Sequence, residues 1–156
     1  MEGENQGLEL ILIEDSHTDI ELFLNVVEWI DMGDQVRVFP DGREALDYLL
    51  GRGAYQNQAP QSPVVIFLDL KMPLLGGVEI LTQLRSDPRT AIHPVVIFTS
   101  SSHDSDVIRS YELGANSYVV KPVQFEKYAE TIRELINYWR NMNRPVVSRH
   151  SPYAEG

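Results

Sequence analysis

Five short, mainly apolar runs alternate along the chain with segments whose apolar residues recur at helical spacing. The runs cover residues 8–13, 36–39, 64–68, 95–98 and 117–120. Apolar runs of about 4–8 residues are typical of strands buried on both faces, and the spaced segments are typical of amphipathic helices. Five strands alternating with five helices predict an α/β domain whose parallel sheet is covered by helices on both faces.

Cap residues and apolar spacing set the expected bounds of the helices. Ser16 or Thr18 can cap the first helix, and Asp41 can cap the second. The spacing places the last three helices at residues 78–84, 107–113 and 125–139. Pro145 then begins a segment without periodicity.

The chain of 156 residues is long enough for one substantial core and too short for two full-sized domains. We expect one domain at residues 8–143, between an N-terminal tail (1–7) and a C-terminal tail (144–156). No apolar run approaches the roughly 18 residues of a membrane span, and the first residues are acidic and polar, unlike a secretory signal. We therefore expect a cytoplasmic protein that has no membrane partner.

The net charge of -10 and the absence of cysteine narrow the possible functions. Binding to nucleic-acid phosphates requires clustered Lys and Arg, so direct binding of DNA or RNA is not expected. Without cysteine the chain has no disulfides, thiolate metal sites or thiol nucleophiles. Any chemistry must therefore use oxygen and nitrogen groups.

Polar or charged residues directly follow four of the five predicted strands. These residues are Glu14, Asp15, Asp69, Thr99 and Lys121. The carboxyl ends of parallel strands meet at one edge of the sheet, where ligands bind in open α/β folds. Taken singly, an Asp at a strand end is more often a turn residue, and a Thr or a Lys there usually has no special function. Their coincidence at one edge predicts a functional site.

Three carboxylates at one sheet edge would repel one another without a cation, and hard oxygen ligands suit Mg²⁺. The sequence therefore predicts a Mg²⁺ site that involves Glu14, Asp15 and Asp69. Asp69 is also the candidate nucleophile, because a carboxylate can accept a phosphoryl group as an acyl phosphate. The Lys121 ammonium and the Thr99 hydroxyl can bind that phosphoryl group, and before transfer Lys121 can pair with Asp69.

Other classes of function remain as alternatives. An aspartate-nucleophile phosphohydrolase also uses Asp and Mg²⁺, but it usually needs a second Asp two residues after the nucleophile, where this chain has Lys71. No G-x-G-x-x-G or G-x-x-x-x-G-K-[ST] motif supports a nucleotide-binding domain. A scaffold that works without phosphorylation is the remaining competitor.

Four segments carry a family resemblance: ILIEDS with its acidic pair, VVIFLDLKMPLLGG around Asp69, VVIFTS in the fourth run, and YVVKP. With these segments the chain resembles the receiver domains of bacterial response regulators over about residues 8–140. The resemblance implies a flavodoxin-like (βα)5 fold with strand order 2-1-3-4-5. It also implies that the backbone carbonyl of Lys71 completes the Mg²⁺ site and that the bond between Lys121 and Pro122 is cis.

The resemblance further implies how such a domain signals. A sensor histidine kinase donates the phosphoryl group to Asp69, and the receiver assists only its own phosphorylation and dephosphorylation. Thr99 moves toward the phosphoryl group and Tyr118 turns into the vacated space, which changes the face of the fourth helix, fifth strand and fifth helix. We expect no output domain in a chain of this length, so the signal must pass through contact with other proteins.

Within the family, DGREALDYLLGRGAY and residues 113–145 are similar to the small regulators paired with phytochrome-type sensor kinases. His17 stands where relatives often carry Pro, and Ser100 stands where a small Ala is common. Ser100 can alter the access of water to the acyl phosphate. His17 is either a metal ligand or, as we favour, a solvent-facing histidine at a helix start.

The last predicted helix is longer than the sheet needs for cover, because Tyr138, Trp139 and Met142 extend it. Exposed aromatic residues of this kind often mark an interface. We expect a homodimer built on this helix, as the similar regulators imply. The alternative is that Trp139 packs over the C-terminal tail.

Overall fold

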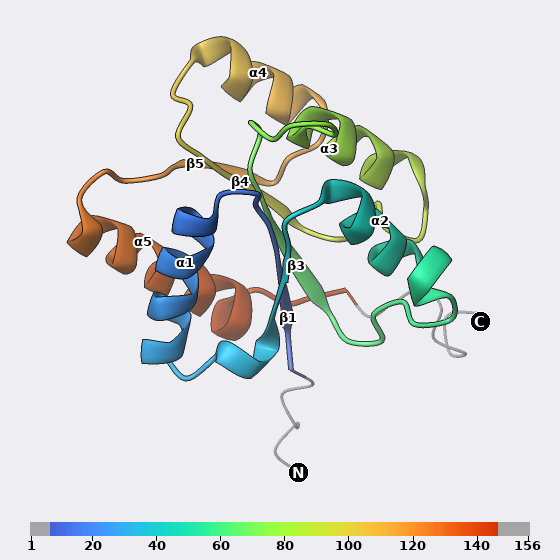
Figure 1. Cartoon of the computed structure of the whole chain (residues 1–156), viewed down its shortest axis with the longest axis horizontal. Coiled ribbons are helices and arrows are strands. Elements are labelled where there is room, and N and C mark those ends of the chain that lie inside the picture. The colour runs from blue at the N-terminus through green and yellow to red at the C-terminus, as the bar shows by residue number, and fades with distance from the viewer. Residues whose placement is uncertain (1–6, 147–156) are drawn as a thin grey trace.

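Five parallel strands form the centre of the fold (Figure 1). The computed structural model describes residues 7–146, apart from the Asp34 side chain. The strands are β1 (Glu9–Ile13), β2 (Val36–Phe39), β3 (Val64–Leu68), β4 (Val95–Thr99) and β5 (Ser117–Val120). Their order is β2-β1-β3-β4-β5, and each neighbouring pair is parallel, which confirms the predicted topology. Most of the two predicted tails lies outside the described residues.

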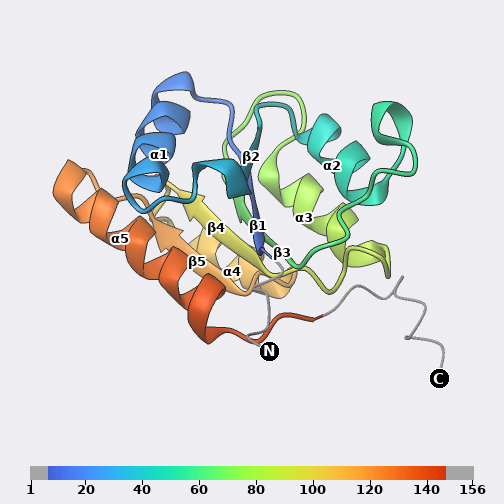
Figure 2. The ribbon, with the colours of Figure 1, turned by 90° about the horizontal axis from the view of Figure 1, so that it is seen from below.

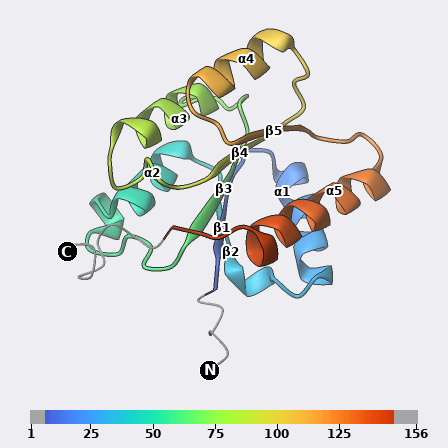
Figure 3. The same cartoon turned by 180° about the vertical axis from the view of Figure 1, so that it is seen from behind.

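Helices cover both faces of this sheet. They are α1 (His17–Trp29), α2 (Gly42–Leu50), α3 (Gly77–Ser86), α4 (Asp104–Glu112) and α5 (Phe125–Asn137). Helices α1 and α5 lie against one face, and α2 and α3 lie against the other (Figure 2). Helix α4 lies on the α3 side, beside β5 (Figure 3). None of the helices in residues 7–146 is long and apolar enough to cross a bilayer.

Three short helical segments complete the described chain. Two are 3-10 turns in loops, η1 (Gly33–Gln35) and η2 (Gly53–Tyr55). The third, η3 (Tyr138–Met142), is a π-helix that directly continues α5. The predicted last helix therefore exists over its full length, but its geometry changes at Tyr138.

Alternating side chains divide the core into two layers. Leu10 and Leu12 of β1 pack with α1 and α5, whereas Ile11 and Ile13 pack with α2 and α3. All residues of β3 and β4 are buried, which is the reason that these strands form continuous apolar runs. Strand β5, at the edge of the sheet, is only partly buried.

The starts of two helices refine the sequence prediction. Ser16, not Thr18, caps α1, because its Oγ accepts a hydrogen bond from the Asp19 backbone nitrogen at 3.3 Å. Helix α4 begins at Asp104 and not at residue 107. Of the residues of α4, all of which the structure describes, only Ser110 is buried. A polar first turn of this kind has no apolar spacing that could reveal it.

Arg85, near the end of α3, joins the loop that precedes β4 to the loop that precedes β5. Its Nε donates to the Gly114 carbonyl oxygen at 2.9 Å. Its Nη1 donates to the carbonyl oxygens of Ala91 at 3.0 Å and His93 at 2.8 Å, and its Nη2 donates to Asn116 Oδ1 at 2.9 Å. One guanidinium therefore fixes both loops against α3.

The surroundings of His93 predict a loss of stability in mild acid. Burial and the nearby Arg85 charge lower the pKa of the imidazole from 6.5 to about 4. Between these values the unfolded chain binds a proton that the folded protein excludes. His93 should therefore lower the free energy of unfolding by about 3 kcal/mol as the pH falls from 6.5 to 4. Urea titrations should show a smaller fall for His93→Gln than for the wild type, and equal falls would contradict this assignment.

Candidate functional site

The carboxyl ends of the strands bring four polar residues to one edge of the sheet. The pairing of β1 with β3 makes the residues that follow them, Glu14 and Asp69, neighbours. The Asp69 backbone nitrogen donates to the Ile13 carbonyl oxygen at 3.1 Å. The Lys121 backbone nitrogen donates to the Thr99 carbonyl oxygen at 2.7 Å, which joins the ends of β4 and β5.

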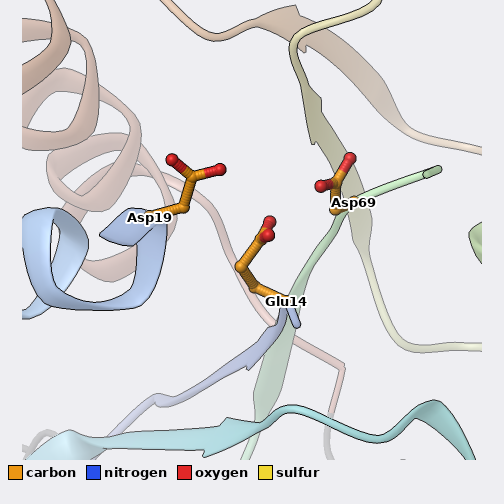
Figure 4. A group of neighbouring side chains, drawn as sticks. All are labelled: Glu14, Asp19 and Asp69. Carbon is orange, nitrogen blue, oxygen red and sulfur yellow. The ribbon is translucent and has the colours of Figure 1, made fainter. Parts of the chain in front are cut away.

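The Lys121 ammonium lies among three carboxylates. Its Nζ is 2.8 Å from Glu14 Oε2, 2.8 Å from Asp19 Oδ2 and 3.4 Å from Asp69 Oδ2. Oxygens of the three acids lie within 4.8 Å of one another. Figure 4 shows the three acidic side chains converging from β1, α1 and β3. The Lys121 side chain is only 7% exposed, so water screens these charges weakly.

One ammonium does not compensate these three acids. Burial raises the pKa of Glu14 to about 7, and the neighbouring Asp69 adds to the rise although Lys121 opposes it. Burial also disfavours the charge on Lys121, but its hydrogen bonds to Asp19 and Glu14 outweigh that effect and raise its pKa to about 12. The site therefore favours a further positive charge.

The acidic group fits a divalent cation. Carboxylate oxygens are the hard ligands that Mg²⁺ prefers, and Mg²⁺ usually takes few protein groups and keeps several waters. Glu14, Asp19 and Asp69 come from three separate elements and can share one ion. In residues 7–146 no other cluster of at least three His, Asp or Glu side chains has this geometry. The group is a divalent-metal site.

Asp19 belongs to this group, although the sequence prediction named Asp15 in its place. Ser16 caps α1 and so puts Asp19 in the first helical turn, facing the strand ends (Figure 4). Asp15 is half-buried and lies outside the group. Adjacent residues of an extended segment point to opposite sides, which separates Asp15 from Glu14. The sequence feature that could have identified Asp19 is an acidic residue in the first helical turn, three positions after the cap residue Ser16.

Thr99 and Tyr118 lie on the side of the site toward α4. Thr99 is buried, and its Oγ1 accepts a hydrogen bond from the Ser101 backbone nitrogen at 3.4 Å. The Tyr118 hydroxyl donates to the Ser101 carbonyl oxygen at 2.9 Å. On the side of the β3–α3 loop, the Lys71 backbone nitrogen donates to Asp69 Oδ1 at 3.4 Å. Both loops that border Asp69 are therefore hydrogen-bonded at the site.

The structure also shows His17, Ser100 and the peptide bond before Pro122, which the family resemblance singled out. His17 is exposed at the start of α1 and lies outside the acidic group, and Ser100 is exposed after β4. No peptide bond in residues 7–146 is cis, so the expectation of a cis bond between Lys121 and Pro122 is wrong for this structure. The bond has the trans form, which is the lower-energy form of an X–Pro bond.

The residues expected at a dimer interface lie in η3. Tyr138 is 45% exposed and Met142 is 69% exposed. Trp139 packs against the core beside α5 and contacts Tyr138 edge to face, with ring centroids 5.0 Å apart. Both aromatic side chains line a cavity of about 720 Å³ together with Pro145 and Val146. Trp139 thus packs within its own chain, while Tyr138 and Met142 are exposed.

Known proteins with this arrangement can be recognised by sequence and by structure. Residues 10–133 match the family model of the response regulator receiver domain. The response regulator Rcp1 of Synechocystis sp. is 32% identical over 130 residues, which cover 83% of this chain and 87% of Rcp1. The crystal structure of the Mn²⁺-bound form of Rcp1 has a TM-score of 0.81 at 28% identity, covering 90% of this chain and 99% of Rcp1.

Two further solved structures are similar. The phosphorylated cyanobacterial phytochrome response regulator RcpA has a TM-score of 0.80 at 29% identity, covering 88% of this chain and 97% of RcpA. The bacteriophytochrome response regulator RtBRR has a TM-score of 0.69 at 42% identity, covering 90% of this chain and 85% of RtBRR. The sheet order, the acids at its edge and the match over residues 10–133 together show that the chain belongs to the response regulator receiver domain family.

Proposed function

We propose that this protein is a single-domain response regulator that accepts a phosphoryl group on Asp69 from a sensor histidine kinase. The position of Asp69 carries the proposal. Its carboxylate follows the central strand β3, shares the metal group with acids of β1 and α1, and lies 3.4 Å from Lys121 Nζ. The similarity to RcpA, which has been solved in a phosphorylated form, supports the same role.

The proposed transfer forms an acyl phosphate. As the P–N bond of the kinase phosphohistidine breaks, a carboxylate oxygen of Asp69 bonds to phosphorus and the imidazole leaves. Lys121 can pair with a phosphoryl oxygen, and Thr99 can donate its hydroxyl hydrogen to another. A bound Mg²⁺ offsets the charge of the acids and of the phosphoryl group. The protein thus assists its own phosphorylation, and we propose no activity on other substrates.

For the metal we propose Glu14, Asp15, Asp69 and the backbone carbonyl of Lys71 as ligands. The 4.8 Å grouping supports Glu14 and Asp69, and the sequence pattern supports Asp15 and Lys71. Asp19, which the structure groups with Glu14 and Asp69, is a further candidate ligand, and its 2.8 Å contact with Nζ holds the Lys121 ammonium at the site.

A phosphohydrolase and a phosphate-independent scaffold are less well supported. The hydrolase needs an Asp as general acid two residues after the nucleophile, and this chain has Lys71 there. The Lys71 ammonium instead pairs with Asp106 Oδ2 at 3.3 Å. Burial of acids around a lysine costs free energy, because desolvation of charged groups is unfavourable. A scaffold that carries out no chemistry does not require such a group.

The output is proposed to run through the face formed by α4, β5 and α5. When Asp69 carries a phosphoryl group, Thr99 moves toward it and Tyr118 turns into the space that Thr99 leaves. Tyr118 is now held at the Ser101 carbonyl, so this turn would break a 2.9 Å hydrogen bond. A partner that reads this face would then distinguish the two states.

The similarity to RcpA and RtBRR supports a phytochrome-like sensor kinase as the phosphoryl donor. The exposed Tyr138 and Met142 support a homodimer that includes η3. Family membership supports a cytoplasmic location and a receiver domain at residues 8–143.

Acetyl phosphate tests the function directly. The protein incubated with Mg²⁺ and this donor should gain the mass of one phosphoryl group in an adduct that survives acid and is lost in base. Asp69→Asn should abolish the adduct. Asp41→Asn is the matched control, because Asp41 is an exposed acid that caps α2 and Asn caps equally well. An adduct that persists in Asp69→Asn would refute the proposal.

A further inference from the structure

A chain of polar contacts runs from the β3–α3 loop to β5, outside the acidic group. Lys71 Nζ lies 3.3 Å from Asp106 Oδ2, in the first turn of α4. The Ser101 hydroxyl donates to the same oxygen at 2.5 Å. The Ser101 carbonyl in turn accepts the hydrogen bond from Tyr118. Asp106 is therefore the point at which both loops beside Asp69 meet α4.

These contacts matter for α4 because the helix has little other anchorage. Ser110 is its only buried residue among the nine from Asp104 to Glu112, and Ile108 and Tyr111 are exposed. The Asp106 carboxylate, in the first turn, accepts the hydrogen bond from the Ser101 hydroxyl and pairs with the Lys71 ammonium. The position of the first turn thus depends on a charged carboxylate that two loops share.

Lys71 can also reach the site of phosphorylation. Its backbone nitrogen lies 3.4 Å from Asp69 Oδ1, so the flexible four-carbon stem starts next to this carboxylate. The side chain is 66% exposed, and nothing but Asp106 holds its ammonium in the part of the chain that the structure describes. A phosphoryl group carries more negative charge than one carboxylate and offers three acceptor oxygens.

We propose that the Lys71–Asp106 ion pair is a latch on the first turn of α4, which a phosphoryl group on Asp69 releases by taking the Lys71 ammonium. This inference rests on the proposed function of Asp69. The release of Lys71 would be a second way in which phosphorylation of Asp69 affects α4, in addition to the movement of Thr99. Asp106 keeps its bond to Ser101 when Lys71 leaves, so the β4–α4 loop and the helix start lose their tie to the β3–α3 loop together. A pair with one largely exposed member, such as Lys71, suits a latch, because it is weak enough to open.

Hydrogen exchange of α4 tests the latch, with beryllofluoride and Mg²⁺ as the phosphoryl mimic. In the wild type, occupancy should speed exchange of residues 104–112 by about fivefold, as expected for the loss of one partly exposed ion pair. Asp106→Asn should show this faster exchange without the mimic, and the mimic should add less than about twofold. Asp104→Asn is the matched control, since it removes an acid from the same turn that has no contact with Lys71. It should respond as the wild type does.

Lys71→Gln keeps the backbone carbonyl and should reproduce the effect of Asp106→Asn, while the double variant should exceed neither single variant. The ¹⁹F NMR signal of bound beryllofluoride reports occupancy independently. A full response in Asp106→Asn, or no response of α4 in an occupied wild type, would overturn the latch and leave the proposed function intact. Failure of the wild type to bind the mimic would overturn both.

Discussion

Lys121→Met is expected to lower the free energy of unfolding by about 3 kcal/mol when no divalent cation is present. The Lys121 ammonium lies 2.8 Å from Glu14 and from Asp19 and 3.4 Å from Asp69. Its removal leaves acids within 4.8 Å of one another without a compensating charge. Methionine fills a similar volume, so the loss reports charge more than packing.

Mg²⁺ should restore much of this loss. The ion and the ammonium compete for the same carboxylates, so Lys121→Met should bind Mg²⁺ about tenfold more tightly than the wild type. Urea unfolding over a Mg²⁺ titration measures both effects. The control is Lys127→Met, which removes an exposed lysine of α5 and should change neither quantity. Equal stability of Lys121→Met and the wild type in EDTA would show that the ammonium does not compensate the acids.

Gly77→Ala should cost about 3 kcal/mol of stability and prevent phosphorylation of Asp69. Gly77 is the buried first residue of α3, and its backbone nitrogen donates to the Leu70 carbonyl oxygen at 3.1 Å. A Cβ at this position would collide with the carbonyl oxygen of Asp69 and lie 2.8 Å from Leu70 Cα. Both are backbone atoms, so the strand end that carries Asp69 would have to move.

The neighbouring glycine provides the control. A Cβ on Gly76 would meet Glu79 Oε2 at 2.8 Å, and this atom is the end of a flexible side chain that can turn away. Gly76→Ala should therefore change the stability by less than about 1 kcal/mol and leave the phosphoryl adduct in place. Chemical denaturation and intact mass after acetyl phosphate treatment measure the two effects. Similar losses in both variants would mean that Gly77 is needed for its backbone flexibility, and not because a side chain there would collide with Asp69.

The strand positions could be predicted because burial on both faces leaves a clear mark on the sequence. The bounds of β3, Val64–Leu68, agree with the apolar run, and Asp69 follows directly. Lys121 was found in the same way, since it follows β5. Residues that end strands need only the order of elements to be placed at one edge, and this order was predicted correctly.

Contacts that depend on how a helix is oriented against the sheet could not be predicted from the order of elements. Asp19 joins the acidic group because Ser16 caps α1 and the first turn of this helix faces the strand ends (Figure 4). The contact of Lys71 with Asp106 depends on a polar start of α4 that apolar spacing does not mark. Spacing along the chain fixes which residues share a helix face, but not where that face is aimed.

The uneven burial of the sheet has a consequence for signalling. Strands β3 and β4 are wholly buried, whereas β5 has one strand neighbour and is only partly covered. Segments with few buried contacts open at lower free energy than the core. Asp69 therefore follows one of the most rigid strands, and Tyr118 lies in one of the least rigid. A small change in charge at Asp69 can thus be converted into a larger movement of the edge strand β5.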